Sequence, residues 1–327
     1  MAHNVETMAW AGKVPWHGLG VEVPADITVP DMLIRAGLDW SVSKRKLFTE
    51  NGSGNKLDLP EVKGRFALVR DSDEQTLDIV GARYVPVQNA DSLGFFTDFI
   101  RSGGMKLHTA GSLCGGQYIW ALAKIEQTMK VASNDTLENY LLLMSPHKLG
   151  VPLVIQQTSV RVVCWNTLNM ALGTGLKGAK NAYRLPHVKE FKGDVQEEAK
   201  RALGLATDQF KQFGEAAKLL SKKLITEADR TEYFKRVFKL DAASLEDRGQ
   251  EDRDFRVIKQ LEEAAVSSPG ADLKSAEGTL WGALNAVTFQ VDHMAGRSRD
   301  KTVRDIWLGY RGDVKRRALT EALALAA

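Results

Sequence analysis

The sequence predicts an α+β protein in which an antiparallel β-meander with flanking helices, a core of the β-β-β-α type, precedes a C-terminal helical region. Three observations predict this. Between Gln117 and Ile125, every second residue from Ile119 onward is apolar, as in a strand with one face on a core. Turn-forming residues separate other strand-length segments in the first half of the chain. After about residue 193, apolar residues recur at helical spacing instead.

Residues 1–37 are expected to form an N-terminal aromatic arm. This segment is rich in Gly, Pro and Trp, which is typical of irregular structure. Trp10 and Trp16 would be unfavourable in water, so the arm is expected to pack on its own domain or on a neighbouring subunit. A short helix is expected from Val29 to Ala36, ended by Gly37.

Residues 38–192 are expected to form the α+β core. Its strands are expected at Trp40–Phe48, Arg65–Arg70, Thr76–Ala82, Lys106–Ala110, Gln117–Ile125, Glu138–Ser145 and Leu153–Gln157. A helix is expected over Asp91–Arg101, and a glycine-rich turn over Gly111–Gly116. Thr158 or Ser159 is expected to cap a further helix that runs from Val160 to Ala171 and ends at Gly173.

Residues 193–327 are expected to be mainly helical. The periodicity predicts helices over Asp194–Leu224, Glu227–Phe238, Arg253–Ala265, Ala276–Met294 and Val314–Leu325.

Charge, cysteine content and the first residues restrict the class of protein. A net charge of +3 permits a nucleic-acid partner without demanding one. Two distant cysteines, Cys114 and Cys164, exclude a disulfide framework and are typical of a reducing compartment. The first residues do not resemble a signal peptide, and no apolar run is long enough to span a membrane. A cytoplasmic protein is therefore expected.

Several blocks of sequence carry a family resemblance. They are Met1–Met8, Pro15–Gly20, Tyr84–Asn89, Thr109–Leu113, Thr158–Leu168 and Gly278–Val287, with the pair Asp292-His293. With these blocks the chain resembles the phage/plasmid-like protein family, which is carried by phages, prophages and plasmids. The resemblance implies a protein of a mobile element in a bacterial host cell and implies no reaction.

The expected order of elements is also similar to the core of ring-forming single-strand annealing proteins. In those proteins a β-β-β-α unit lines a basic groove that holds stretched single-stranded DNA. The segment Val151 to Gly173 would correspond to the last strand and the helix of that unit. This second likeness concerns the order and length of elements and involves no shared motif.

Basic and aromatic residues around the expected helix from Val160 to Ala171 are the candidate DNA-binding residues. Clustered cations attract phosphates without any fixed spacing, and flat aromatic rings can stack on bases. The candidates are Lys148, Arg161, Trp165, Asn166, Lys177, Lys180, Tyr183 and Arg184, within a segment that also holds His187, Lys189 and Lys192. The alternative is that these residues form an ordinary solvated surface.

These observations lead to three hypotheses. The first is a single-stranded DNA-binding, strand-annealing recombination protein that forms a homo-oligomeric ring or filament and needs no cofactor. The second is a partner-binding modulator of host defence or replication. The third is a metal-dependent nuclease that uses scattered residues such as Glu277, Asp292 and His293. Because the sequence shows no catalytic constellation and no spaced metal ligands, a protein without enzymatic activity is expected.

Overall fold

A computed structural model describes most of the chain, and it confirms the α+β class with antiparallel sheets. The described residues are 5–12, 19–50, 59–102, 104–161, 166–169, 182–204, 206–240, 248–294 and 310–327. The chain divides into two compact units. Unit 1 comprises Met1–Glu126, Leu141–Gln156 and Ala182–Leu203, and unit 2 comprises Gln127–Tyr140, Gln157–Asn181 and Gly204–Ala327.

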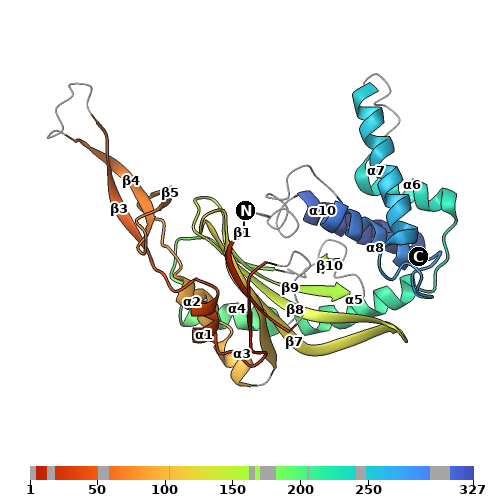
Figure 1. Cartoon of the computed structure of the whole chain (residues 1–327), viewed down its shortest axis with the longest axis horizontal. Coiled ribbons are helices and arrows are strands. Elements are labelled where there is room, and N and C mark those ends of the chain that lie inside the picture. The colour runs from red at the N-terminus through yellow and green to blue at the C-terminus, as the bar shows by residue number, and fades with distance from the viewer. Residues whose placement is uncertain are drawn as a thin grey trace. The chain divides into compact units, whose positions relative to one another are not determined.

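The main sheet has eight strands in the hydrogen-bonded order β10-β9-β8-β7-β6-β1-β2, with β11 paired to β9 (Figure 1). Their bounds are β1 Val5–Ala11, β2 Val21–Val23, β6 Met105–Leu113, β7 Tyr118–Ala132, β8 Asp135–Pro146, β9 Leu153–Arg161, β10 Asn166–Asn169 and β11 Ala182–Leu185. The predicted strands in this region are confirmed, and β7 and β8 extend beyond the predicted bounds.

The N-terminal segment is partly a strand, so the expectation of an irregular arm is wrong for Val5–Ala11. Strand β1 pairs antiparallel with β6, and Trp10 is buried against unit 1. Gly111 permits this pairing, because a Cβ atom there would lie 2.3 Å from Cη2 of Trp120 and 2.4 Å from the carbonyl oxygen of Thr7. Trp16 lies outside the described residues.

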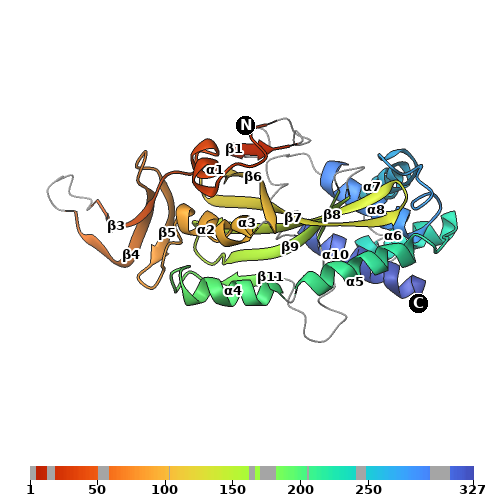
Figure 2. The same cartoon turned by 90° about the horizontal axis from the view of Figure 1, so that it is seen from below.

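Four helices cover the apolar core of unit 1 (Figures 1 and 2). They are α1 Val29–Arg35, α2 Asn89–Gly94, α3 Thr97–Arg101 and α4 Asp194–Gly204. The predicted helix at residue 29 is confirmed, with Thr28 as its cap and Gly37 at φ +66° after its end. The single helix predicted over Asp91–Arg101 is instead α2 and α3, and at their junction Phe95 and Phe96 are both buried.

A second sheet in unit 1 has three strands in the order β3-β4-β5. These are β3 Val42–Phe48, β4 Glu61–Arg70 and β5 Thr76–Gly81, which confirms the three strands predicted here (Figure 1). Val42, Leu68, Leu77 and Val80 form a small apolar cluster with Tyr84, which follows the last strand. This cluster packs the end of β5 and the loop that follows it, residues 81–84, against the second sheet.

The helix predicted from Val160 to Ala171 is wrong where the structure describes it. Residues up to Arg161 continue β9, and Asn166–Asn169 form β10, which pairs antiparallel with β9. The physical reason is the run of β-branched residues Thr158, Val160, Val162 and Val163, which lose side-chain freedom in a helix and favour strands. The described residues therefore lack the helix that the likeness to annealing proteins required.

The glycine-rich turn predicted over Gly111–Gly116 begins later than expected. Gly111 to Leu113 belong to β6, and the turn to β7 is made by Cys114, Gly115 and Gly116, all with positive φ. The predicted glycine-rich turn is therefore confirmed as a turn between two strands, β6 and β7, with a later start.

Unit 2 contains the predicted helical region. Its helices are α5 Ala206–Leu220, α6 Glu227–Phe238, α7 Arg248–Ser267, α8 Leu280–Phe289 and α10 Tyr310–Ala326, with a π-helical segment, η3, at Gln290–Met294. The helix predicted over Glu227–Phe238 is confirmed at both ends. The one predicted over Asp194–Leu224 is divided into α4 and α5. Trp281 of α8 lies fully buried in the apolar core of this unit.

Two buried polar contacts stabilise unit 2. The Asp135 carboxylate accepts hydrogen bonds from Oγ of Ser275 at 2.7 Å and from Nε1 of Trp281 at 2.9 Å. Nζ of Lys315 lies 2.8 Å from Oδ1 of Asp292, and burial lowers the pKa of this lysine. Both contacts join segments that are distant in sequence, so they hold the unit together by specific geometry as well as by apolar burial.

None of the helices in the described part of the chain combines the length and apolar character that crossing a bilayer requires.

Candidate functional site

Unit 1 contains a pocket of about 590 Å³ between three loops. The lining residues are Gly81, Ala82, Arg83, Tyr84, Leu149, Gly150, Val151, Pro152, Pro186, His187 and Val188. Antiparallel pairing explains why two of the loops meet. Leu153 at the start of β9 is the partner of Leu185 at the end of β11, so the chain entering β9 lies beside the chain leaving β11.

Backbone and side-chain hydrogen bonds hold the three loops together. The backbone N–H of Val85 donates to the carbonyl of His187 at 2.8 Å, which joins the loop after β5 to the loop after β11. The backbone N–H of Leu149 donates to Oδ2 of Asp78 at 2.8 Å, which joins the loop before β9, the second loop, to β5. The pocket is thus formed before any ligand arrives, a property that reduces the ordering cost of binding.

Tyr84 and His187, two of the residues that line the pocket, stack on each other. The centroids of Tyr84 and His187 are 4.7 Å apart with an interplanar angle of 13°, and both residues are buried. Burial raises the pKa of Tyr84 and lowers the pKa of His187, so both rings are neutral near pH 7.

The hydrogen bonds of His187 define its tautomer. Nδ1 lies 3.2 Å from the carbonyl oxygen of Val85, which can only accept, so Nδ1 carries the proton. Nε2 is then an acceptor, and it is buried without a hydrogen-bond partner among the described atoms.

A second buried histidine, His147, lies next to this pair. Nδ2 of Asn89 donates to the carbonyl oxygens of Leu38 and Trp40, so its Oδ1 faces His147 and accepts from Nε2 at 2.8 Å. Complete burial, with a smaller contribution from nearby His187, lowers the pKa of His147 to about 3. The His147 ring is therefore neutral across the physiological range.

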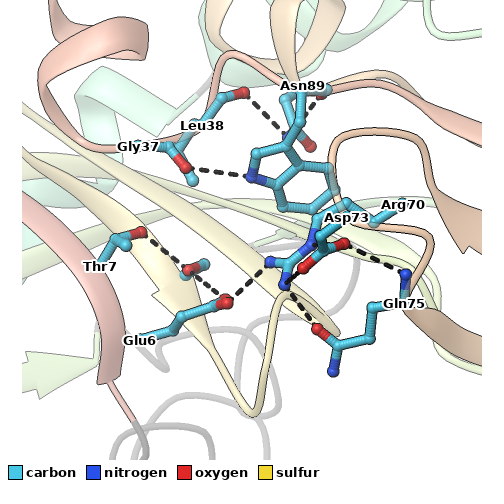
Figure 3. A network of polar contacts seen from close by, with 10 residues as sticks. Glu6, Thr7, Gly37, Leu38, Arg70, Asp73, Gln75 and Asn89 are labelled. Atoms are coloured by element: carbon cyan, nitrogen blue, oxygen red, sulfur yellow. Dashed lines mark hydrogen bonds and ion pairs between the residues drawn. The ribbon is translucent and has the colours of Figure 1, made fainter.

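Figure 3 shows a polar network in which Arg70 contacts Glu6 and Asp73. The ring centroids of Trp40 and His147 are 5.4 Å apart. The guanidinium carbon of Arg70 lies 5.1 Å from the centroid of the Trp40 ring. Arg70 donates from Nη1 to Oε1 of Glu6 at 2.7 Å and from Nε to Oδ1 of Asp73 at 2.9 Å. The network joins β1 to the β4–β5 turn, and Trp40 links it to Asn89 at the start of α2 and to His147.

Three cations lie on the loops that form the pocket. Arg83 is exposed on the first loop, Lys148 directly precedes Leu149, and Lys189 directly follows Val188. No carboxylate lies within ion-pair distance of these three cations among the described residues. Nearby Lys192, by contrast, pairs with Asp91 at 3.4 Å and Glu190 at 3.9 Å. The three cations, here called the rim cations, remain available to an anionic ligand.

The structure places some of the predicted DNA-binding residues near this pocket. Lys148 is one of the rim cations. Tyr183 and Arg184 are consecutive on β11, so their side chains point to opposite faces of the sheet. Tyr183 packs against the core of unit 1, whereas Arg184 is exposed. These two residues therefore do not share one surface.

Other predicted residues cannot be assigned to a surface. The backbones of Arg161 and Asn166 face each other in the β9–β10 pair, but their side chains lie outside the described part. Trp165, Lys177 and Lys180 lie outside the described residues altogether. The role of all these residues in DNA binding stays a prediction.

The residues proposed for a nuclease show no metal cluster where the structure describes them. Across the described ranges, no three His, Cys, Asp or Glu side chains come close enough to hold a metal ion. The Asp292 carboxylate pairs with buried Lys315, and the ring of His293 lies 4.7 Å from that of Phe289. Glu277 is exposed.

Neither the lining residues Arg83 and Tyr84 nor the nearby buried His147 was predicted from the sequence. Tyr84 belongs to a sequence block that carries the family resemblance, which was the one available signal. A single buried histidine has no recognisable sequence pattern, since its environment comes from distant segments.

Comparison with known proteins gives a family and no function. A family model described as "Domain of unknown function (DUF932)" matches residues 76–311, which include all the pocket residues. No curated protein and no solved structure matches the chain.

Proposed function

We propose that this protein, which belongs to the family described as a domain of unknown function (DUF932), binds single-stranded DNA through the pocket-bearing surface of unit 1. One observation carries the proposal: the rim cations lie on three loops around one pocket and have no carboxylate partner among the described residues. Repeated phosphates are the natural ligand of such cations, because their attraction needs no fixed spacing.

Exposed apolar residues beside these cations favour a single strand over a duplex. Leu149 and Val188 are 46% and 57% exposed at the pocket. The bases of an unpaired strand offer flat apolar faces to such side chains, whereas a duplex hides those faces within its own stack. Exposed Arg184, on the strand that leads into the third loop, would extend the cationic surface.

We further propose that such binding serves strand annealing by a homo-oligomer in the cytoplasm of a bacterium, within the life cycle of a phage or other mobile element. The support is the resemblance of the sequence blocks to the phage/plasmid-like family. Annealing needs no cofactor, since base pairing supplies the free energy. The test is the rate at which complementary oligonucleotides pair with and without the protein, together with its mass by light scattering.

The binding proposal is tested by fluorescence anisotropy with a labelled oligothymidylate at several salt concentrations. We expect tight binding at low salt that weakens as salt rises. The triple variant Arg83→Gln, Lys148→Gln, Lys189→Gln should lower the slope of log K against log salt by about 2, because each phosphate contact of a single strand contributes about 0.7. Its affinity should fall at least tenfold.

A matched control removes the same charge elsewhere. Lys46, Lys106 and Lys218 each pair with a glutamate on the surface, so changing all three to glutamine keeps the net charge of the test variant. The control should bind DNA within twofold of the native protein. Equal weakening of both variants, or no binding of the native protein at low salt, would overturn the proposal. A folded protein with no affinity for DNA would favour the partner-binding hypothesis instead.

A further inference from the structure

We infer that the pocket of unit 1 is a nucleobase site, in which one base of the bound strand leaves the stack and lies beside Tyr84 and His187. This inference rests on the proposed function and adds the part of the ligand that the pocket takes. The rim cations contact phosphates, and the pocket between them takes the base.

The size and composition of the pocket fit a base better than they fit a phosphate. Its volume of about 590 Å³ falls within the range of about 300–1,000 Å³ that is usual for small-molecule sites. Val151, Pro152 and Pro186 provide apolar walls, and the only charged residue that lines it is Arg83. A phosphate would lose its hydration against such walls, whereas a planar base would gain apolar contact.

Tyr84 and His187 form part of the pocket wall. Their rings stack on each other, both residues are buried, and both are neutral near pH 7. An uncharged wall of this kind favours a planar base over a phosphate and does not select one base.

The position of the rim cations indicates a nucleotide within a strand. They lie on the loops at residues 83, 148 and 189, and these same loops form the pocket walls. A base inside the pocket therefore has positive charge on three loops around it, where the phosphates on its two sides would pass. Asp78 holds the second loop through the backbone N–H of Leu149, so the cations and the walls keep their positions together.

The experiment separates base binding from phosphate binding in the full-length protein. Val151→Trp fills the pocket with an indole ring and leaves the rim cations unchanged. Ile79→Trp is the matched control, since Ile79 is 50% exposed on β5 and does not line the pocket. Each variant is titrated with oligothymidylate that carries a single 2-aminopurine, whose fluorescence rises when it leaves the stack, and with a strand that carries one abasic nucleotide at that position.

We expect Val151→Trp to weaken binding about tenfold, to abolish the rise in 2-aminopurine fluorescence and to leave the salt slope unchanged. Ile79→Trp should behave as the native protein. Fluorescence that rises equally in Val151→Trp and the native protein would overturn the base site while DNA binding stands. No DNA binding by the native protein would overturn the proposed function itself.

A second measurement does not depend on the folding of a variant. The native protein alone should bind a strand of regularly spaced abasic nucleotides at least tenfold more weakly than oligothymidylate of the same length, because the pocket would then have no base to hold. Equal affinity for the two strands would overturn the inference, since phosphates would account for all of the binding.

Discussion

The buried histidine behind the pocket makes unit 1 sensitive to acid in a way that can be measured. His147 is fully buried and neutral, with a pKa of about 3 in the folded protein against an ordinary value of 6.5. Below about pH 6.5 the unfolded chain takes up a proton that the folded chain refuses, so unfolding is favoured. The stabilisation is complete above pH 6.5 and is lost progressively as the pH falls toward 3.

The magnitude follows from the size of the pKa difference. Each pH unit between the two pKa values corresponds to about 1.4 kcal/mol, so the folded state loses about 2 kcal/mol from this residue between about pH 7.5 and pH 5.0. His147→Gln removes the titration but keeps an N–H group that can donate to Oδ1 of Asn89. The variant should therefore lose about 2 kcal/mol less stability than the native protein over the same interval.

Urea unfolding at the two pH values provides the assay, followed by tryptophan fluorescence because Trp40 lies next to the His147 ring. His187 is present in both the native protein and His147→Gln, so its titration largely cancels from the difference in stability between them. The NMR chemical shifts of ¹³C-labelled histidine give an independent measurement. At pH 5.0 the His147 ring should still show the chemical shifts of a neutral imidazole. An equal loss of unfolding free energy in the native protein and in His147→Gln would refute the reasoning. So would a measurement in which all six histidines titrate near pH 6.5.

Three substitutions test the packing of the two units by urea unfolding. Gly111→Ala should lower the free energy of unfolding by about 3 kcal/mol, because the added methyl group would clash with the Trp120 ring and the Thr7 carbonyl. The control Gly94→Ala has open space around the added methyl group and should change the free energy of unfolding by less than about 1 kcal/mol. Asp135→Ala should cost about 3 kcal/mol by leaving two buried donors without an acceptor, and a loss under about 1 kcal/mol would argue against that contact. Lys315→Met should cost about 3–5 kcal/mol, whereas adding Asp292→Leu should recover part of the loss, since a buried charge is then no longer unpaired. No recovery in the double variant would contradict this account.

Local periodicity predicted most of the elements because their signals are contained within the elements themselves. The helix at Glu227–Phe238 combines a threonine cap with apolar residues at helical spacing, and it begins and ends where expected. The alternation after Gln117 likewise identified β7. The segment from Thr158 failed because two local signals disagree: the spacing of Val160, Val163 and Leu168 suits a helix, whereas the β-branched run suits a strand. Pairing with β10 and β11 decides between them, and that pairing is not local.

The candidate site could be predicted only in part, because it is formed by contacts between segments that are distant in sequence. Its walls come from segments near residues 83, 150 and 187, and only the β9–β11 register together with the Val85–His187 hydrogen bond brings them into contact. A count of cations in the third segment suggested nucleic acid but could not distinguish Lys189 from Lys192. The structure distinguishes them, since Lys192 is neutralised by two carboxylates and Lys189 has none within reach among the described residues.

That distinction matters more for function than the number of basic residues. A cation beside a carboxylate gives up a contact worth at most about 1 kcal/mol, and that carboxylate also repels the phosphate, so its net attraction is lower than that of a cation without a carboxylate partner. The rim cations meet this condition, and they lie on the three loops that form an uncharged, largely apolar pocket wall beside Arg83. A charge-matched comparison of the rim cations with the paired lysines therefore tests the argument at its central step: if the two sets contribute equally to DNA affinity, local pairing does not control binding here, and the pocket loses its claim to be the site.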